Sequence, residues 1–598
     1  MTDSLLENGP RAGLPRAGFL GLGLALAAGL ITALPSLFSG FFLDDLAQIA
    51  LMEPWYPRNA GTFNLYSFLG ELPLDPWWKH PDFQVALWRP LSSALLRVDQ
   101  RLFGHDSIGY HAHSLLWLAC LLALVAAFYR KRLSPRVATL ALLIFALDEC
   151  HILTAGWIAN RHAMVAMVPT VLGLMAHLRW RQEGWSLGLP LSLLGYAVGM
   201  AASEASLGIM AYVVAFEVFG QARRLRDLWR GLTPVAVLGV AYVLAYKAMG
   251  FGAARSGFYL DPLRETQEFF LGALGHIPAF LSAAVFGLPS DLWFFAPEMR
   301  PIQIGVGVLA ALLLAFLVTK LWPTIGDENK AVLRWIAPGA LLSLLPSAIS
   351  QPFDRNLLAP MLGGGVVLAV IITELWAVGR GSSARSFVRA GALGLATLLV
   401  LIHLLLAPVG RIGTFRFMGD EWRNLRRLAA RLPADVLPGD EADVVFLAAP
   451  DIVIGGFLPL VHGFEGQPCF HSWEVLSLAP YDYEIVRTDA RTLEMRMLEG
   501  QMLTSPPERF HRPSSTPLRR GDVIRTADLE VEVLEDNGLG PVRVTFRFAR
   551  SLDSGPWRFL AWTEEGVESV GIPEIGETRR YPYVPGPLEA ALSNLSPL

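Results

Sequence analysis

The stretch "AGFLGLGLALAAGLITALPSLFSGFFLDD" (residues 17–45) joins an apolar run to two adjacent aspartates, Asp44 and Asp45. The run at 17–38 is long enough to cross a bilayer, since a membrane-spanning helix needs about 20 residues. Its small residues would also suit a cleaved secretory signal, but the many apolar runs that follow favour an uncleaved span. We therefore expect a membrane crossing here, with the two aspartates directly beyond its end.

The composition of the whole chain agrees with a polytopic membrane protein. Of its 598 residues, 53% are hydrophobic and only 17% are charged, and the mean hydropathy is +0.42. Such values lie far from those of soluble globular proteins. A net charge of −4 offers no basic surface, which argues against a nucleic-acid partner. Cys120, Cys150 and Cys469 are too few and too scattered for a disulfide framework or a thiolate metal site.

Further apolar runs are expected to cross the membrane, at 110–129, 137–150, 160–178, 185–201, 204–219, 231–249, 303–321, 331–349, 357–378 and 388–408. With the N-terminus in the cytoplasm, "RKRLSPR" (130–136) and the later basic clusters all fall on the cytoplasmic side, as positive-inside bias requires. About eleven spans then place the chain beyond residue 411 outside the cytoplasm. A bacterial inner membrane is favoured over an endoplasmic one, because no C-terminal retrieval signal is seen.

One more apolar stretch, "EFFLGALGHIPAFLSAAVFG" (268–287), is also long enough to span. A crossing there would move the last two basic clusters to the outside. We therefore predict an interfacial or re-entrant segment within 266–300, with its helix interrupted around His276 and Pro278. A true crossing is the alternative.

The sequence divides into a membrane domain (1–410) and an extracytoplasmic soluble domain (411–598). Within the second part, "DEWRNLRRLAARL" (420–432) has the pattern of an amphipathic helix. Strand-like enrichment in β-branched and aromatic residues, bounded by turn signals, occurs at 442–450, 528–536 and 542–552. We expect a small mixed α/β or mostly β domain.

The first extracytoplasmic loop, residues 40–109, is far too long to be a simple connector. It is rich in aromatic residues that favour the headgroup level of a bilayer: Trp55, Tyr56, Trp77, Trp78 and Trp88. The stretch 88–104 carries apolar residues at helical spacing and predicts a helix lying on the membrane surface. Aspartates beyond a span are often only a solvated flank. An aromatic roof over Asp44 and Asp45, however, would perturb their pKa values and favours a catalytic role.

Several motifs in order resemble those of the type-C (GT-C) membrane glycosyltransferases. They are "FLDD" (42–45), "WRPLSSALLRVDQRLFG" (88–104) with "GYHAHSLLWL" (109–118), "FALDECHILTAGWIANRHAMVA" (145–166), "ASEASLGIMAYVVAFEVF" (202–219) and "DRNLLAPMLGGGVVLA" (354–369). The likeness covers roughly residues 17 to 378. It is nearest to the branch that contains the protein O-mannosyltransferases and the transmembrane-and-TPR O-mannosyltransferases, although no TPR array follows here.

The resemblance implies transfer of a sugar from a polyprenyl-phosphate-linked donor to a protein, glycan or lipid acceptor at the outer face of the bilayer. It makes Asp44 the leading candidate for the general base and Asp45 its partner or a group that positions the acceptor. In the third-span motif, relatives commonly read His-Pro-x-x-x-Glu where this chain has "LDECHILTAGW", and they often read Ser-Lys-Glu where it has Ala202-Ser203-Glu204. The further candidates for the donor or acceptor site are His111, His113, Asp148, Glu149 and Glu204.

Residue chemistry agrees with this reaction. A lipid phosphate is a good leaving group, so the enzyme needs no proton donor of the glycosidase kind. One carboxylate that accepts the proton of the acceptor hydroxyl suffices, and a single displacement inverts the anomeric centre. Arginine suits the departing phosphate. Arg355 is the first choice, with Arg89, Arg161 and His162 as further candidates. Arg355 could instead pair with Asp354 or extend to lipid headgroups.

Other possibilities remain open. Asp44, Asp45, His111 and His113 could together bind a divalent cation, but their spacing does not require it, and we expect no required metal or other cofactor. The alternative function is a transporter or lipid flippase with an extracytoplasmic binding domain. Transporters commonly show internal repeats, which we do not detect, and the acids here lie beyond the ends of spans. The sequence does not specify the sugar.

Overall fold

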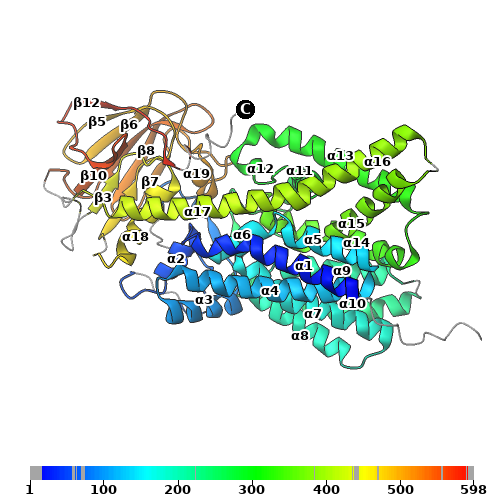
Figure 1. The fold of residues 1–598 in the computed structure, drawn as a ribbon. Coiled ribbons are helices and arrows are strands. Elements are labelled where there is room, and N and C mark those ends of the chain that lie inside the picture. Colours follow the sequence, from blue (N-terminus) through cyan, green and yellow to red (C-terminus); the bar gives the residue numbers. More distant parts are fainter. Residues whose placement is uncertain are drawn as a thin grey trace, which may run out of the picture.

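The computed structural model describes residues 16–56, 61, 63–68, 75–221, 224–382, 384–433, 436, 443–467, 470–553, 557–587 and 589, so Cys469 lies outside the described residues. Helices form a long bundle, and the strands that follow gather into a separate layer at one end of it (Figure 1). This arrangement confirms the expected fold class of a helical membrane part followed by a mixed α/β part.

Every predicted span forms a helix. These are α1 (Arg16–Ala33), α4 (Ser107–Arg132), α5 (Pro135–Leu147), α7 (His162–Glu183), α8 (Gly188–Ala202), α9 (Ser206–Phe219), α10 (Leu225–Ala248), α13 (Arg300–Leu321), α14 (Asp327–Ser347), α15 (Leu358–Arg380) and α16 (Ser386–Leu401). Eight helical stretches within the described residues are long and apolar enough to cross a membrane, whereas α5, α8 and α9 are apolar but shorter. Most residues of α15 are buried, so this helix forms the centre of the bundle.

The helix α11 (Thr266–Phe286) is continuous, so the predicted interruption around His276 and Pro278 is wrong. The carbonyl of Pro278 lies against Gly307 of α13, where a Cβ would come within 1.9 Å of the carbonyl oxygen. His276 is fixed as well, because its Nδ1 lies 3.1 Å from the carbonyl oxygen of Ala348.

Both ends of α11 lie at the same end of the bundle. Just before it, Arg264 donates to the Gln84 side chain in the first loop at 3.0 Å. Just after it, the Ser290 amide donates to Asp354 at the start of α15 at 2.9 Å. By length and composition α11 also qualifies as a span. An interfacial or re-entrant placement therefore stays our prediction, and these contacts agree with it.

The first loop forms α2 (Asp44–Ala50), β1 (Gln84–Ala86) and α3 (Pro90–Phe103), and β1 pairs antiparallel with β2 (Gly252–Ala254). The expected headgroup position is wrong for Trp77 and Trp78, which are 1% and 2% exposed. Trp77 instead donates from Nε1 to the carbonyl of Leu476 at 3.0 Å and packs against Phe546. This part of the loop therefore packs against the C-terminal domain.

A single long helix leads from the bundle into the C-terminal domain. It consists of α16, a π-helical turn η5 (Ile402–Leu406) and α17 (Ala407–Ala429), and Figure 1 shows α17 reaching the strands. The predicted amphipathic helix is the last part of α17. The domain boundary drawn at residue 410 falls inside this helix.

The C-terminal domain holds two sheets in the described residues. The strand order β11-β10-β3-β4 contains β3 (Asp443–Phe446), β4 (Ser472–Val475), β10 (Trp557–Thr563) and β11 (Gly566–Ser569), with β3 parallel to both neighbours. The antiparallel order β12-β5-β6-β9-β8-β7 contains β5 (Tyr483–Arg487), β6 (Thr492–Met497), β7 (Val523–Arg525), β8 (Leu529–Asp536), β9 (Pro541–Phe548) and β12 (Thr578–Tyr581). Apolar and charged residues alternate along β8, as in a strand with one buried face: Leu529, Val531 and Val533 are buried, and the glutamates between them are more exposed.

Short helical elements complete the connections. They are η1 (Leu34–Phe38), α6 (His151–Gly156), η2 (Ile158–Arg161), α12 (Leu292–Phe295), η3 (Pro297–Met299), η4 (Asp354–Leu357), η6 (Val453–Phe457), α18 (Leu458–Phe464) and α19 (Pro506–His511).

Candidate active site

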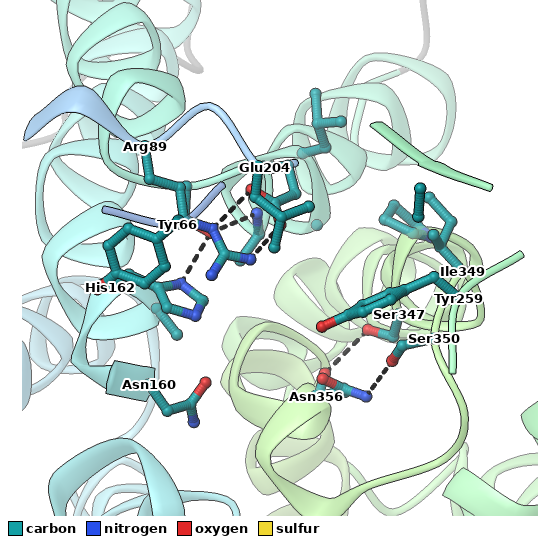
Figure 2. Close-up of a pocket in the computed structure, with 18 of the residues that line it drawn as sticks. Tyr66, Arg89, Asn160, His162, Glu204, Tyr259, Ser347, Ile349, Ser350 and Asn356 are labelled. Atoms are coloured by element: carbon teal, nitrogen blue, oxygen red, sulfur yellow. Dashed lines mark hydrogen bonds and ion pairs between the residues drawn. The ribbon is translucent and has the colours of Figure 1, made fainter. Parts of the chain in front are cut away.

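A cavity of about 470 Å³ lies where the first loop meets the bundle. Residues distant in sequence form its wall: Asp44 from α2, Arg89 before α3, Glu204 between α8 and α9, Tyr259 after β2, and Arg355 before α15. Figure 2 shows two facing walls, with Tyr66, Arg89, His162 and Glu204 on one and Tyr259, Ser347, Ser350 and Asn356 on the other. The predicted general base and the predicted phosphate-binding arginine thus share one cavity.

Asp45 positions Asp44. Its buried carboxylate accepts hydrogen bonds from the amides of Phe42 at 3.0 Å and Ala159 at 2.6 Å, which fastens the start of α2 to the start of α7. Leu43, which lies between Phe42 and Asp44, has a φ of 46°. This conformation costs a leucine free energy and is found mostly where surrounding contacts enforce it. Asp44 lines the cavity, whereas the Asp45 carboxylate accepts hydrogen bonds from backbone amides.

The surroundings of Asp44 suit a proton acceptor. Burial raises the pKa of Asp44 above its ordinary value, while the positive charges of Arg355 and Arg89 act in the opposite direction. A carboxylate with a raised pKa holds a proton more strongly, and this is what a general base requires. Burial also raises the pKa of Asp45, to about 8, although its two amide donors oppose this shift.

Arg355 is held by aromatic rings. Its guanidinium lies 4.8 Å from the ring centroid of Trp157 and 4.8 Å from that of Phe353. Such cation–π contacts contribute from about 0.5 to 2 kcal/mol each. Trp157 is fixed in turn, because its Nε1 donates to the carbonyl of Phe42 at 2.9 Å.

Arg355 does not form the ion pair with Asp354 that was its alternative role. The Asp354 carboxylate accepts from the amide of Ser290 at 2.9 Å and from its hydroxyl at 2.6 Å. No carboxylate within the described part of the chain forms a salt bridge with Arg355. Because aromatic faces hold this cation, its N–H groups are available to an anionic ligand.

Arg89 and Glu204, predicted for different roles, bind each other. Arg89 Nε donates to Glu204 Oε2 at 3.0 Å, and Arg89 Nη2 bonds to the second carboxylate oxygen. The guanidinium also lies 5.0 Å from the ring centroid of Tyr66. Burial alone would raise the pKa of Glu204, but the charge of Arg89 holds it below its ordinary value. This pair fastens the start of α3 to the connection between α8 and α9.

We expect Arg89→Met to destabilise the membrane domain by about 2 kcal/mol, because Glu204 would lose the positive charge that compensates for its burial. The value is below that of a fully enclosed pair, since the Glu204 side chain is 32% exposed toward the cavity. Thermal unfolding in detergent at pH 7 measures the effect. The double variant with Glu204→Gln should recover much of the loss, and additive losses in the double variant would contradict this prediction.

Three further predicted residues lie behind the wall. Arg161 pairs with the buried Asp99, whose other oxygen lies 2.6 Å from His113 Nδ1. His111 Nε2 lies 2.7 Å from the carbonyl oxygen of Gly40. None of the three predicted side chains lines the cavity. This geometry does not support their expected roles in binding the donor or acceptor. The three side chains instead connect α3, α4 and the start of α7.

Asp148 and Glu149 also lie away from the cavity lining. The Asp148 carboxylate accepts from the Cys150 amide at 3.0 Å and lies 3.5 Å from His403 Nδ1. Burial, together with the charge of Asp148, raises the pKa of Glu149 to about 8. Within the described residues, no group of three or more His, Cys, Asp or Glu side chains is placed to hold a metal ion.

Sequence reasoning missed several polar groups of the cavity. Gln48 follows Asp44 by one helical turn and faces the same cavity, and neither of its amide atoms has a hydrogen-bond partner within the described residues. Asn160 Nδ2 and the Tyr242 hydroxyl are likewise buried and unpartnered there. Asn356 donates to the Ser350 hydroxyl at 2.7 Å. Buried polar atoms without partners are rare, so this lining is suited to a polar ligand. Only the place of Asn356 beside Arg355 could have signalled any of these.

Comparisons with known proteins found distant likenesses only. No family model and no curated protein matches the chain. An oligosaccharyltransferase of Archaeoglobus fulgidus, solved with a tethered acceptor peptide, is 13% identical over 76% of this chain, with a TM-score of 0.37. The chain spans 64% of the length of that protein. ArnT of Cupriavidus metallidurans, solved with undecaprenyl phosphate, is 14% identical over 75% of this chain and 85% of its own, with a TM-score of 0.40. At these scores the likeness does not assign a family.

Proposed function

We propose that this protein is a GT-C-type membrane glycosyltransferase that moves a sugar from a polyprenyl-phosphate-linked donor to a hydroxyl acceptor at the extracytoplasmic face. The observation that carries the proposal is the shared cavity of Asp44 and Arg355. A carboxylate with a raised pKa and a cation held by aromatic rings are the two groups that this reaction needs on opposite sides of an anomeric carbon.

In the proposed reaction, the donor phosphate binds Arg355 and the acceptor hydroxyl donates a hydrogen bond to Asp44. The hydroxyl oxygen attacks the anomeric carbon as the bond from that carbon to the phosphate oxygen breaks. Asp44 takes the hydroxyl proton, and the phosphate leaves with the electron pair while Arg355 balances its charge. Attack from the face opposite the phosphate inverts the anomeric configuration. No metal or other cofactor is assigned to these steps.

The rest of the cavity supports a donor with a polar head and an apolar tail. Gln48, Asn160 and Tyr242 offer polar atoms that have no hydrogen-bond partner among the described residues and that suit sugar hydroxyls. Apolar side chains such as Leu263 and Ile349 line other parts of the cavity and suit the first isoprene units. The bilayer itself would accommodate the remaining tail.

We expect the full chain in lipid nanodiscs to consume a polyprenyl-phosphate-linked sugar and to release a glycoside of inverted anomeric configuration. A panel of radiolabelled donors identifies the sugar, and NMR of the product gives the configuration. Retention of configuration would contradict the single displacement. Passage of intact donor across a sealed proteoliposome, with no donor consumed, would instead identify a lipid flippase.

A further inference from the structure

The short helix α19 of the C-terminal domain touches the loop that carries Tyr259 into the cavity wall. The amide of Gly257 donates to the carbonyl of Phe510 at 3.2 Å. A Cβ at Gly257 would lie 2.2 Å from the carbonyl oxygen of Arg509, so only glycine permits this approach. The loop and the C-terminal domain are therefore in backbone contact.

Aromatic rings continue this contact to the cavity. The Phe510 ring meets the Phe258 ring edge to face, with centroids 5.4 Å apart. Phe258 stacks on Phe353 at 5.0 Å with an interplanar angle of 10°. Phe353 in turn forms one of the two aromatic faces that hold the Arg355 guanidinium. The rings thus form a continuous series of contacts from the C-terminal domain to the cation.

Backbone bonds hold the same two segments together. Tyr259 forms an antiparallel bridge with Ser350, and the amide of Gln351 donates to the carbonyl of Phe258 at 2.8 Å. Tyr259 and Ser350 both line the cavity. A displacement of the loop at Phe258 would therefore move the wall that contains Arg355.

The helix α19 has a fixed position from which to act. Glu508 is fully buried, and its carboxylate accepts from the backbone amide of Ser505 at 3.0 Å, which caps the helix. Arg512 Nε donates to the carbonyl of Trp78 at 2.7 Å, and the amide of His80 donates to the carbonyl of His511 at 3.0 Å. The C-terminal domain and the first loop therefore clamp α19 from two sides.

We propose that the C-terminal domain is a positioning element of the cavity, with Phe510 as the residue that sets the place of Arg355 through Phe258 and Phe353. This inference rests on the proposed function, because the value of a fixed Arg355 lies in binding the donor phosphate. It assigns to the C-terminal domain a role in donor binding, in addition to any contact with the acceptor.

The test is Phe510→Ala in the full chain in nanodiscs, with radiolabelled undecaprenyl phosphate as the probe. We expect the Kd for the probe to rise about tenfold, because Phe353, one of the two aromatic supports of Arg355, would lose the ring contacts that reach it from Phe510 through Phe258. We also expect the acid limb of the transfer rate to move to higher pH, since Arg355 would lower the pKa of Asp44 less. Phe510→Tyr keeps the ring and should behave as the wild type.

Phe470→Ala is the matched control, because Phe470 is also a partly buried phenylalanine of the C-terminal domain with two ring neighbours, His462 and Trp473. It should change neither the Kd nor the pH limb. If Phe510→Ala does not fold, Phe258→Leu removes the same ring stack from the loop side and should give the same two changes.

The outcomes separate the two proposals. If the variants at Phe510 and Phe258 bind the probe as the wild type does and keep its pH limb, the positioning role is wrong while the transferase proposal stands. If the wild type itself neither binds undecaprenyl phosphate nor transfers sugar, the proposed function is wrong and the positioning role falls with it.

Discussion

Asp44→Asn should reduce sugar transfer by about 1,000-fold, within the 10²- to 10⁴-fold range that general acid–base groups contribute. The asparagine side chain has nearly the same shape, so the cavity should keep its form, but the amide cannot accept the proton of the acceptor hydroxyl. The initial rate of transfer from the labelled donor, at saturating donor and neutral pH, measures the loss. The Kd for undecaprenyl phosphate should stay within about threefold of the wild type, because in the proposed reaction Arg355, and not Asp44, binds the phosphate.

The neighbouring substitution Asp45→Asn is the matched control. The Asp45 carboxylate accepts hydrogen bonds from two backbone amides and lies outside the cavity lining. Asp45→Asn should therefore lower the melting temperature but have much less effect than Asp44→Asn on the transfer rate per folded molecule. The assignment of the base would be overturned by full transfer in Asp44→Asn, or by an equal loss per folded molecule in both variants.

The pH profile of the wild type follows from the same carboxylate. Asp44 can accept a proton only when it is ionised, so the rate should fall as the pH drops through its pKa. Burial places that pKa above the ordinary value for an aspartate. The acid limb should therefore lie at higher pH than a solvent-exposed aspartate would give, and it should be absent from the residual rate of Asp44→Asn.

The sequence was sufficient to predict the helices, because a long apolar run in a chain of this composition has few alternatives to a buried or membrane helix. It also assigned Asp44 and Arg355 to the same reaction, and both residues line one cavity of the structure. The break at Pro278 was wrong for a local reason. Proline disfavours a helix interior, yet α11 continues through Pro278, which packs closely against Gly307 of α13.

The division of polar side chains between cavity and support could not be read from spacing. His111 and His113 lie two positions apart on α4, about 200° around the helix, so one meets Gly40 and the other Asp99. Arg161 and His162 are adjacent, yet only His162 lines the cavity. The pairing of Arg89 with Glu204 joins positions 115 residues apart, which no local pattern reveals.

The same limit explains the tryptophans of the first loop. Trp77 and Trp78 have the composition of a membrane-interface belt, and in a bare loop that would be the reasonable prediction. In the folded protein both rings are buried instead, and the Leu476 carbonyl accepts a hydrogen bond from the indole N–H of Trp77. The presence of that domain could be predicted from the sequence, but the surface to which it docks could not.

Arg355→Met should lower transfer by about 100- to 1,000-fold, the usual effect of removing one group that stabilises developing negative charge. Methionine keeps an apolar contact with Trp157 and Phe353 but carries no charge and donates no hydrogen bond. Unlike Asp44→Asn, this variant should also weaken binding of undecaprenyl phosphate. The transfer rate of Arg355→Lys should lie between those of the wild type and Arg355→Met, because lysine keeps the charge but not the paired donors of the guanidinium.

A second effect of Arg355→Met distinguishes a cation inside the cavity from one that only stabilises the fold. Arg355 lowers the pKa of Asp44, so its removal should move the acid limb of the remaining activity to higher pH. Arg300→Met is the matched control, since Arg300 also lies over an indole, 5.2 Å from the centroid of Trp293, but does not line the cavity. It should leave the acid limb and phosphate binding unchanged. An acid limb that does not move in Arg355→Met, together with unchanged phosphate binding, would show that Arg355 and Asp44 do not act on one substrate.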